Sequence, residues 1–148
     1  MAATLTVKVE GNPYMDGEQA FKVILDWVSH TDGAVALAIA STYATSKPFG
    51  DFGPLPSKIR GNLKSVETAP GLLGDLTTAL PTAYTLTILD KYSLDILGGN
   101  GTARSASAAQ KLVPTEDLYI DSELTLTIAS AGSGTKGRII MDFEKYDA

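Results

Sequence analysis

Short segments in which apolar and polar residues alternate recur along the chain, and they restrict its fold more than any other feature. In the clearest two, near the C-terminus, apolar residues fill alternate positions of 124–128 and 139–143. Because successive side chains of a strand point to opposite faces, each segment is expected to form a strand with one buried face. Residues 131–137 between them read Ala-Gly-Ser-Gly-Thr-Lys-Gly, a composition that tolerates chain reversal. The pattern predicts a β-hairpin.

Other segments predict further strands. Three have regular apolar faces, formed by Leu5, Val7 and Val9, by Phe21, Val23, Leu25 and Trp27, and by Tyr84, Leu86 and Ile88. Residues 35–40 and 59–66 are less regular but also favour strands, and a further short strand is expected at 95–97. The links 69–75 and 102–109 are rich in small or turn-forming residues and could each hold a short helix, the second more readily.

These segments predict an all-β protein. Six to eight short strands separated by turn signals, without long helical patterns between them, favour an antiparallel β-sandwich or flattened barrel over a parallel α/β sheet. A chain of 148 residues suits one domain, residues 1–148. Residues 1–12 are expected to form an N-terminal strand or arm. Residues 44–58 are expected to form an extended loop, because three of the seven prolines lie there.

Composition restricts the partners. The net charge is -5, and no stretch combines Lys or Arg with interleaved aromatic residues, so nucleic acid is not an expected partner. Without cysteine the chain can form neither disulfides nor thiolate metal sites. The N-terminus lacks the continuous apolar segment of a secretory signal, and the longest mostly apolar run, 33–40, is too short to cross a bilayer. No membrane partner is expected.

Residues suited to catalysis or metal binding are scarce. His30 is the single histidine, and its Ser-His-Thr-Asp-Gly context predicts an exposed turn. Zinc or copper would therefore depend on carboxylates almost alone, which does not fit their usual ligands. We expect no enzyme activity, no cofactor and no transition metal. Asp90, Asp95 and the glycine-rich residues 98–101 could offer oxygens to calcium, but their spacing departs from the EF-hand loop and favours solvated turn carboxylates.

The aromatic residues allow two interpretations. Stacked on one surface they would form a sugar-binding platform, whose members would be Trp27, Tyr43, Phe49, Phe52 and Tyr84. Trp27, however, is in phase with the apolar face of its strand, which favours a place in the core. Phe49 and Phe52 lie in the proline-rich loop and need something to pack against, either the sandwich itself or a neighbouring subunit.

The order of several sequence blocks resembles that of small structural proteins from tailed bacteriophages. The blocks are GNLKSVETAPG at 61–71, PTAYTLTILD at 81–90, DILGG at 95–99, ARS at 103–105, and the glycine-rich segment 131–140. The resemblance covers roughly residues 61–143, and its motifs are turn and strand signatures. It implies a virion structural protein, assembled in the host cytoplasm, and carries over no functional residues.

We therefore expect a non-enzymatic capsid decoration or cement protein that binds the major capsid protein or other virion proteins. A homo-oligomer, a trimer or dimer, would suit local capsid symmetry. The expected contact residues are Phe49, Phe52, Pro54, Leu55 and Pro56 in the loop, with Leu5, Val7 and Val9 in the N-terminal strand. A head–tail or tail component of the virion and a carbohydrate-binding β-sandwich module are the alternatives.

Overall fold

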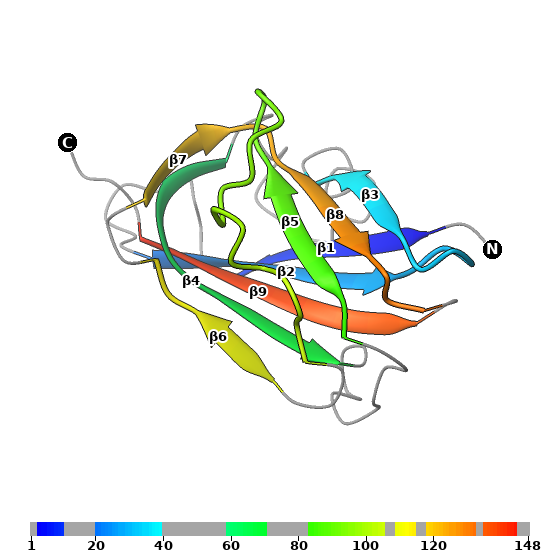
Figure 1. Ribbon diagram of the computed structural model, residues 1–148. Coiled ribbons are helices and arrows are strands. Elements are labelled where there is room, and N and C mark those ends of the chain that lie inside the picture. The colour runs from blue at the N-terminus through cyan, green and yellow to red at the C-terminus, as the bar shows by residue number, and fades with distance from the viewer. Residues whose placement is uncertain are drawn as a thin grey trace.

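The protein is an all-β sandwich of two antiparallel sheets (Figure 1). The computed structural model describes residues 3–10, 20–39, 59–70, 83–105, 109–114, 118–132 and 135–144. Nine strands lie within these residues, so the predicted fold class is confirmed and the predicted six to eight strands are too few. The described residues include no helix long and apolar enough to cross a membrane.

The larger sheet has six strands in the order β1–β2–β9–β4–β6, with β7 also paired to β4. Their bounds are β1 Thr4–Glu10, β2 Ala20–Val28, β4 Ile59–Pro70, β6 Gln110–Leu112, β7 Leu118–Ser122 and β9 Lys136–Glu144. One end of β4 pairs with β7 and the other with β6, while β9 occupies the opposite edge of β4 along most of its length. The long strand β4 therefore joins both short strands to the sheet.

The smaller sheet has three strands in the order β3–β8–β5 and packs across one face of the larger sheet (Figure 1). Its strands are β3 Val35–Ala38, β5 Thr85–Leu89 and β8 Thr125–Ala129. Each sheet turns one row of side chains toward the other, as in other sandwiches.

The predicted hairpin near the C-terminus is wrong. Its two segments are the strands β8 and β9, but β8 pairs with β3 and β5 in the smaller sheet, whereas β9 pairs with β2 and β4 in the larger one. The chain thus passes from the smaller sheet to the larger one between β8 and β9. Alternation identifies which side of a strand is buried, and both sheets bury one side, so the pattern could not identify the pairing partner.

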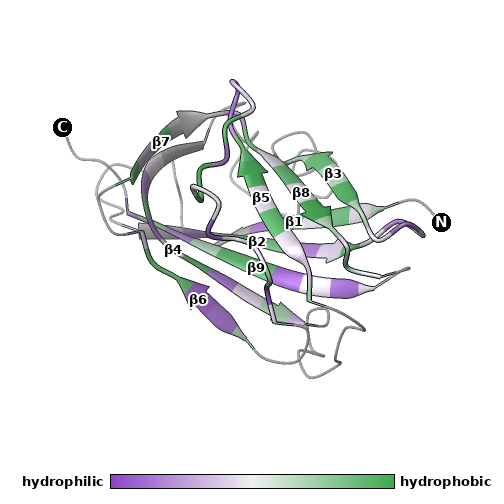
Figure 2. Cartoon of the chain, in the orientation of Figure 1, coloured by the Kyte–Doolittle hydropathy of each residue, from purple (hydrophilic) through white to green (hydrophobic). Residues whose placement is uncertain are grey.

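The core lies between the two sheets, where burial follows the alternation. In β9 the side chains of Ile139, Met141 and Phe143 are buried, and in β8 those of Leu126 and Ile128. The smaller sheet is coloured largely as hydrophobic in Figure 2. Burial of each large apolar side chain contributes roughly 1.5–3 kcal/mol relative to an exposed one.

Trp27 lies fully inside this core, against the backbone of β9. A Cβ atom on Gly137, the pairing partner of Trp27, would lie 2.3 Å from the indole Cζ2 atom. Only glycine leaves room for the ring at this position. The core position expected for Trp27 is confirmed.

The other corrections concern short elements. Residues 102–105 form a turn and a single bridge instead of helix, and residues 106–108 lie outside the described part of the chain. Residues 95–97 form one bridge and a turn instead of a strand. The sequence patterns missed β6 and β7, and β4 continues through Pro70, past the predicted end at 66.

Candidate functional site

The segment that follows β5 is held along the free edge of that strand. The backbone N–H of Ile96 donates to the Ile88 oxygen at 2.9 Å, and that of Leu86 donates to the Gly101 oxygen at 2.8 Å. A Cβ atom on Gly101 would lie 2.0 Å from the Leu86 oxygen, so this close approach requires glycine. The returning chain therefore takes up hydrogen bonds that β5 would otherwise offer to water.

Two aspartates shape the loop between β5 and the returning chain. Asp95 accepts backbone hydrogen bonds from Ile88 and Leu97 through Oδ1, at 3.2 and 3.1 Å, and from Gly99 through Oδ2 at 2.9 Å. Asp90 Oδ1 accepts from the backbone N–H groups of Tyr92 and Leu94, at 2.8 and 3.0 Å. Both carboxylates thus act as acceptors that fix the loop, the role expected of turn carboxylates.

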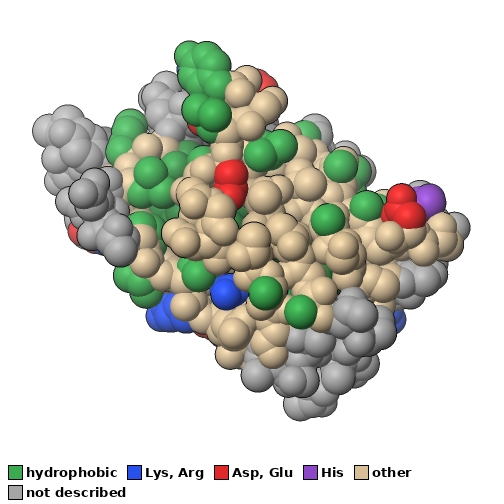
Figure 3. All heavy atoms as spheres, viewed as in Figure 1, with side chains coloured by type: hydrophobic (Ala, Val, Ile, Leu, Met, Phe, Trp, Pro, Cys, Tyr) green, Lys and Arg blue, Asp and Glu red, His purple; other side chains and the backbone are tan. Residues whose placement is uncertain are grey.

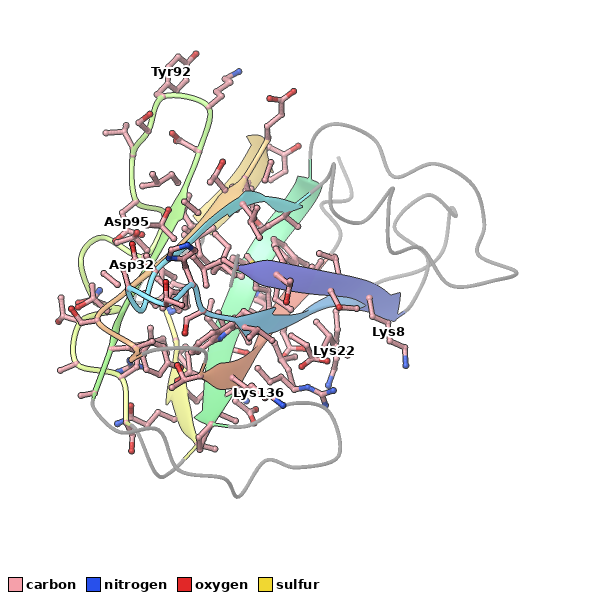
Figure 4. All side chains as sticks on the ribbon, turned by 90° about the vertical axis from the view of Figure 1, so that its right-hand side faces the viewer. Lys8, Lys22, Asp32, Tyr92, Asp95 and Lys136 are labelled. Atoms are coloured by element: carbon pink, nitrogen blue, oxygen red, sulfur yellow. The ribbon has the colours of Figure 1, made fainter. Side chains whose placement is uncertain are left out.

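Residues 90–94, here called the tip, project from the sandwich and expose apolar side chains. Tyr92 is 72% exposed and Leu94 is 63% exposed. Figure 3 shows hydrophobic side chains at the outer end of the projecting loop, and Figure 4 shows Tyr92 there. The Lys91 Nζ atom lies 5.2 Å from the centre of the Tyr92 ring, within cation–π range. The tip therefore presents an aromatic and an aliphatic group to solvent on a hydrogen-bonded base.

A second unusual group of side chains lies inside the molecule, at the other end of β5. Tyr84 and Arg104 exchange backbone hydrogen bonds, and the Tyr84 ring meets Trp27 edge to face at a centroid distance of 5.3 Å. Burial raises the pKa of Tyr84 to about 12, against smaller opposing effects of the Thr68 hydroxyl and the Arg104 charge. We call Trp27, Thr68, Tyr84 and Arg104 the Arg104 cluster.

Every member of the Arg104 cluster has a buried polar atom without a hydrogen-bond partner. The atoms are Trp27 Nε1, Thr68 Oγ1, Tyr84 Oη, and Nε and Nη1 of Arg104. Thr68 is close enough to influence Tyr84, yet the two hydroxyls lack regular hydrogen-bond geometry. Most buried polar groups in proteins are hydrogen-bonded, so this concentration of unpaired groups is unusual.

Most of the predicted contact residues lie outside the described structure. Phe49, Phe52, Pro54, Leu55 and Pro56 lie outside the described residues, together with the whole predicted loop 44–58. The side chains of Leu5 and Val7 are packed in the core, and the side chain of Val9 is not described. The N-terminal segment is nevertheless a strand, β1, at the end of the strand order in the larger sheet.

The sugar-platform interpretation loses two of its five aromatic residues. Trp27 and Tyr84 are buried against each other in the core, and Tyr43, Phe49 and Phe52 lie outside the described residues. His30 lies in an exposed turn, as predicted, with its Nδ1 atom 3.2 Å from Asp32 Oδ1. No group of three or more His, Cys, Asp or Glu residues within the described ranges is arranged to hold a metal ion.

Sequence reasoning missed both the tip and the Arg104 cluster. A signal for the tip was present, because Tyr92 and Leu94 are large apolar residues inside a segment of turn formers. Arg104 carries no such signal, since its neighbours Ala103 and Ser105 suit an exposed link equally well.

Comparisons of the chain with protein-family models, with curated proteins and with solved structures find no match.

Proposed function

We propose that this protein is a non-enzymatic structural protein of a tailed-phage virion, and that it stabilises the phage head as a decoration protein. The observation that carries the binding role is the exposed apolar tip on its hydrogen-bonded base. The partner class is an inference from the resemblance over residues 61–143 to phage structural proteins. The major capsid protein is the proposed partner, and a trimer or dimer is the proposed assembly.

The tip has the properties of a small binding anchor. Tyrosine is enriched among the residues that dominate interface energies, since it buries a large area and loses few rotatable bonds. Tyr92 and Leu94 are both exposed, and Asp90 accepts hydrogen bonds from both of their backbone N–H groups. A loop ordered before binding loses less conformational entropy on association than a flexible one. The tip is therefore suited to insertion into an apolar pocket of a partner.

The covered β5 edge of the smaller sheet also fits a protein that binds its partner through side chains. An open strand edge can pair with another chain and lead to aggregation. Residues 95–104 occupy the β5 edge through hydrogen bonds to Leu86 and Ile88. Protection of this edge leaves the tip as the projecting feature on this side of the sandwich (Figure 1).

The proposal is tested on phage heads assembled without the protein. Purified wild-type protein is added, and the number of bound copies and the temperature of DNA release are measured. Hundreds of bound copies and a raised release temperature are expected. A dozen copies or fewer would instead place the protein at the neck or tail, and no binding would overturn the virion role.

The role of the tip is tested with paired variants in the same assay. Tyr92→Ser with Leu94→Ser is expected to weaken binding by about tenfold or more, because two apolar anchors are lost. Val113→Ser is the matched control, since Val113 is similarly exposed but follows β6 on the larger sheet. Equal binding by both variants would show that the tip is not the contact.

A further inference from the structure

Two nitrogens of the Arg104 guanidinium group are buried, and no ion pair among the described residues involves Arg104. The residue is 8% exposed, and neither Nε nor Nη1 has a hydrogen-bond partner. The ion pairs that join described residues all involve other side chains, such as Arg138 with Asp26. A buried charge without a counter-charge strongly destabilises a protein, so buried charges are normally paired. The position of Arg104 therefore suggests that an anion belongs beside it.

The neighbouring groups would complete a site for such an anion. Tyr84 Oη and Trp27 Nε1 are hydrogen-bond donors, Thr68 Oγ1 can donate as well, and all three lack partners. The Tyr84 hydroxyl keeps its proton at neutral pH, because burial raises the pKa of Tyr84 to about 12. The cluster thus combines one fixed positive charge with three neutral donors and contains no carboxylate.

The cluster is also held in place from both sheets. Trp27 and Thr68 belong to β2 and β4 of the larger sheet, while Tyr84 directly precedes β5 of the smaller sheet. Arg104 is fixed to Tyr84 by backbone hydrogen bonds of 2.7 and 3.3 Å. Donors fixed in this way lose little freedom when a ligand binds.

We propose that Arg104, Tyr84, Thr68 and Trp27 form a binding site for an oxyanion, either a carboxylate or a phosphate. The planar guanidinium presents parallel N–H groups that match two oxygens of such an anion, and charge-assisted hydrogen bonds of this kind are strong. Buried water could pair with the hydroxyls and the indole, but it would leave the charge of Arg104 uncompensated. The site lies at the opposite end of β5 from the tip and does not depend on the virion role.

The site contains its own reporter, because Trp27 is the only tryptophan of the chain. Trp27 fluorescence of the full chain is followed while inorganic phosphate, or in a parallel series acetate, replaces chloride at constant ionic strength. A saturable change in emission, with a rise in Tm, is expected for at least one of the two anions. Response to phosphate alone identifies a phosphate site, and response to acetate identifies a carboxylate site. The absence of a saturable change in both series would overturn the proposal.

Variants assign the response to Arg104. Arg104→Met removes the charge and keeps a long apolar stem, and it is expected to weaken anion affinity by about tenfold or more. Lys136→Met is the matched control, since Lys136 is an exposed cation at the start of β9 (Figure 4), and it is expected to keep the wild-type response. An unchanged response in Arg104→Met would exclude this site. If Arg104→Met does not fold, Tyr84→Phe replaces it, with a weaker but measurable loss of affinity expected.

Discussion

Ser29 and Thr135 connect two of the links through which the chain passes between the sheets. The Ser29 backbone N–H donates to the Thr135 oxygen at 2.8 Å, and the Thr135 N–H donates to Ser29 Oγ at 2.9 Å. Ser29 follows β2 and precedes β3, while Thr135 follows β8 and precedes β9. The link that leaves the larger sheet after β2 is thus hydrogen-bonded to the link that returns to it before β9.

The Ser29 hydroxyl is predicted to contribute substantially to stability. It is fully buried, donates to the Gly132 oxygen at 2.7 Å and accepts the Thr135 N–H. Ser29→Ala would leave both groups without this partner, and we expect a loss of about 2 kcal/mol in the free energy of unfolding, measured in urea. Thr31→Ala, in the exposed part of the same turn, should change it by less than about 0.5 kcal/mol. Equal effects of the two variants would contradict this role.

The crossing also shows how far the sequence determined the fold. Alternation identified β1, β2, β5, β8 and β9 with their buried faces, because each of these strands has one side in the core. Pairing partners depend on contacts between segments distant in sequence, such as Ser29 with Thr135, which no local pattern encodes. The glycine-rich link was therefore interpreted as a hairpin turn, although it carries the chain to the other sheet.

The sequence patterns did not identify the short strands or the candidate sites, for related reasons. β6 has three residues, too few to show a period, and the sequence of β7, LYIDS, does not alternate between apolar and polar residues; both strands pair with β4. The burial of Arg104 depends on tertiary packing, whereas the exposure of Tyr92 follows from a turn that Asp90 fixes. The burial of Arg104 could therefore not be predicted from the local sequence, whereas the exposure of Tyr92 could.

Asp95 is predicted to stabilise the loop that carries the tip. Its carboxylate accepts three backbone N–H groups, and Asp95→Asn would turn one acceptor oxygen into a donor that faces another donor. We expect the free energy of unfolding to fall by about 1–2 kcal/mol and hydrogen exchange at the Gly99 amide to become faster. Asp32→Asn is the comparison, because Asp32 accepts one backbone N–H, from Ala34, through Oδ1. A larger loss in Asp32→Asn than in Asp95→Asn would refute the assignment.

Two ion pairs on the outer face of the larger sheet should differ in strength. Arg138 binds Asp26 through Nε and Nη2 at 2.8 and 3.1 Å, with side-chain exposures of 11% and 14%. Lys22 and Asp142 lie 3.7 Å apart with exposures of 53% and 29%. Double-mutant cycles with Arg138→Met and Asp26→Asn should give a coupling energy of about 1–3 kcal/mol, against about 0.5 kcal/mol or less for Lys22→Met and Asp142→Asn. A stronger coupling in the second cycle would show that burial and two-atom geometry do not determine the difference.

Tyr84 is predicted to make stability depend on alkaline pH. Burial is the largest cause of its shift, from a pKa of 10.0 to about 12. The folded state holds the Tyr84 proton more tightly than the unfolded state does. The contribution of this difference to the free energy of unfolding is therefore complete below pH 10 and is lost as the pH rises toward 12. The loss amounts to about 2–3 kcal/mol, since each pKa unit corresponds to about 1.4 kcal/mol.

The comparison of wild type with Tyr84→Phe isolates this contribution from other groups that titrate in the same range. Phenylalanine keeps the packing against Trp27 and removes the hydroxyl, which has no hydrogen-bond partner, so the variant should fold at neutral pH. The free energy of unfolding of the wild type should fall more steeply between pH 10 and 12 than that of Tyr84→Phe. Phenolate absorbance should show one tyrosine of the six titrating near pH 12 in the folded wild type and lost in the variant. Parallel stability curves for the two proteins would mean that the Tyr84 hydroxyl ionises as easily in the fold as in the unfolded chain.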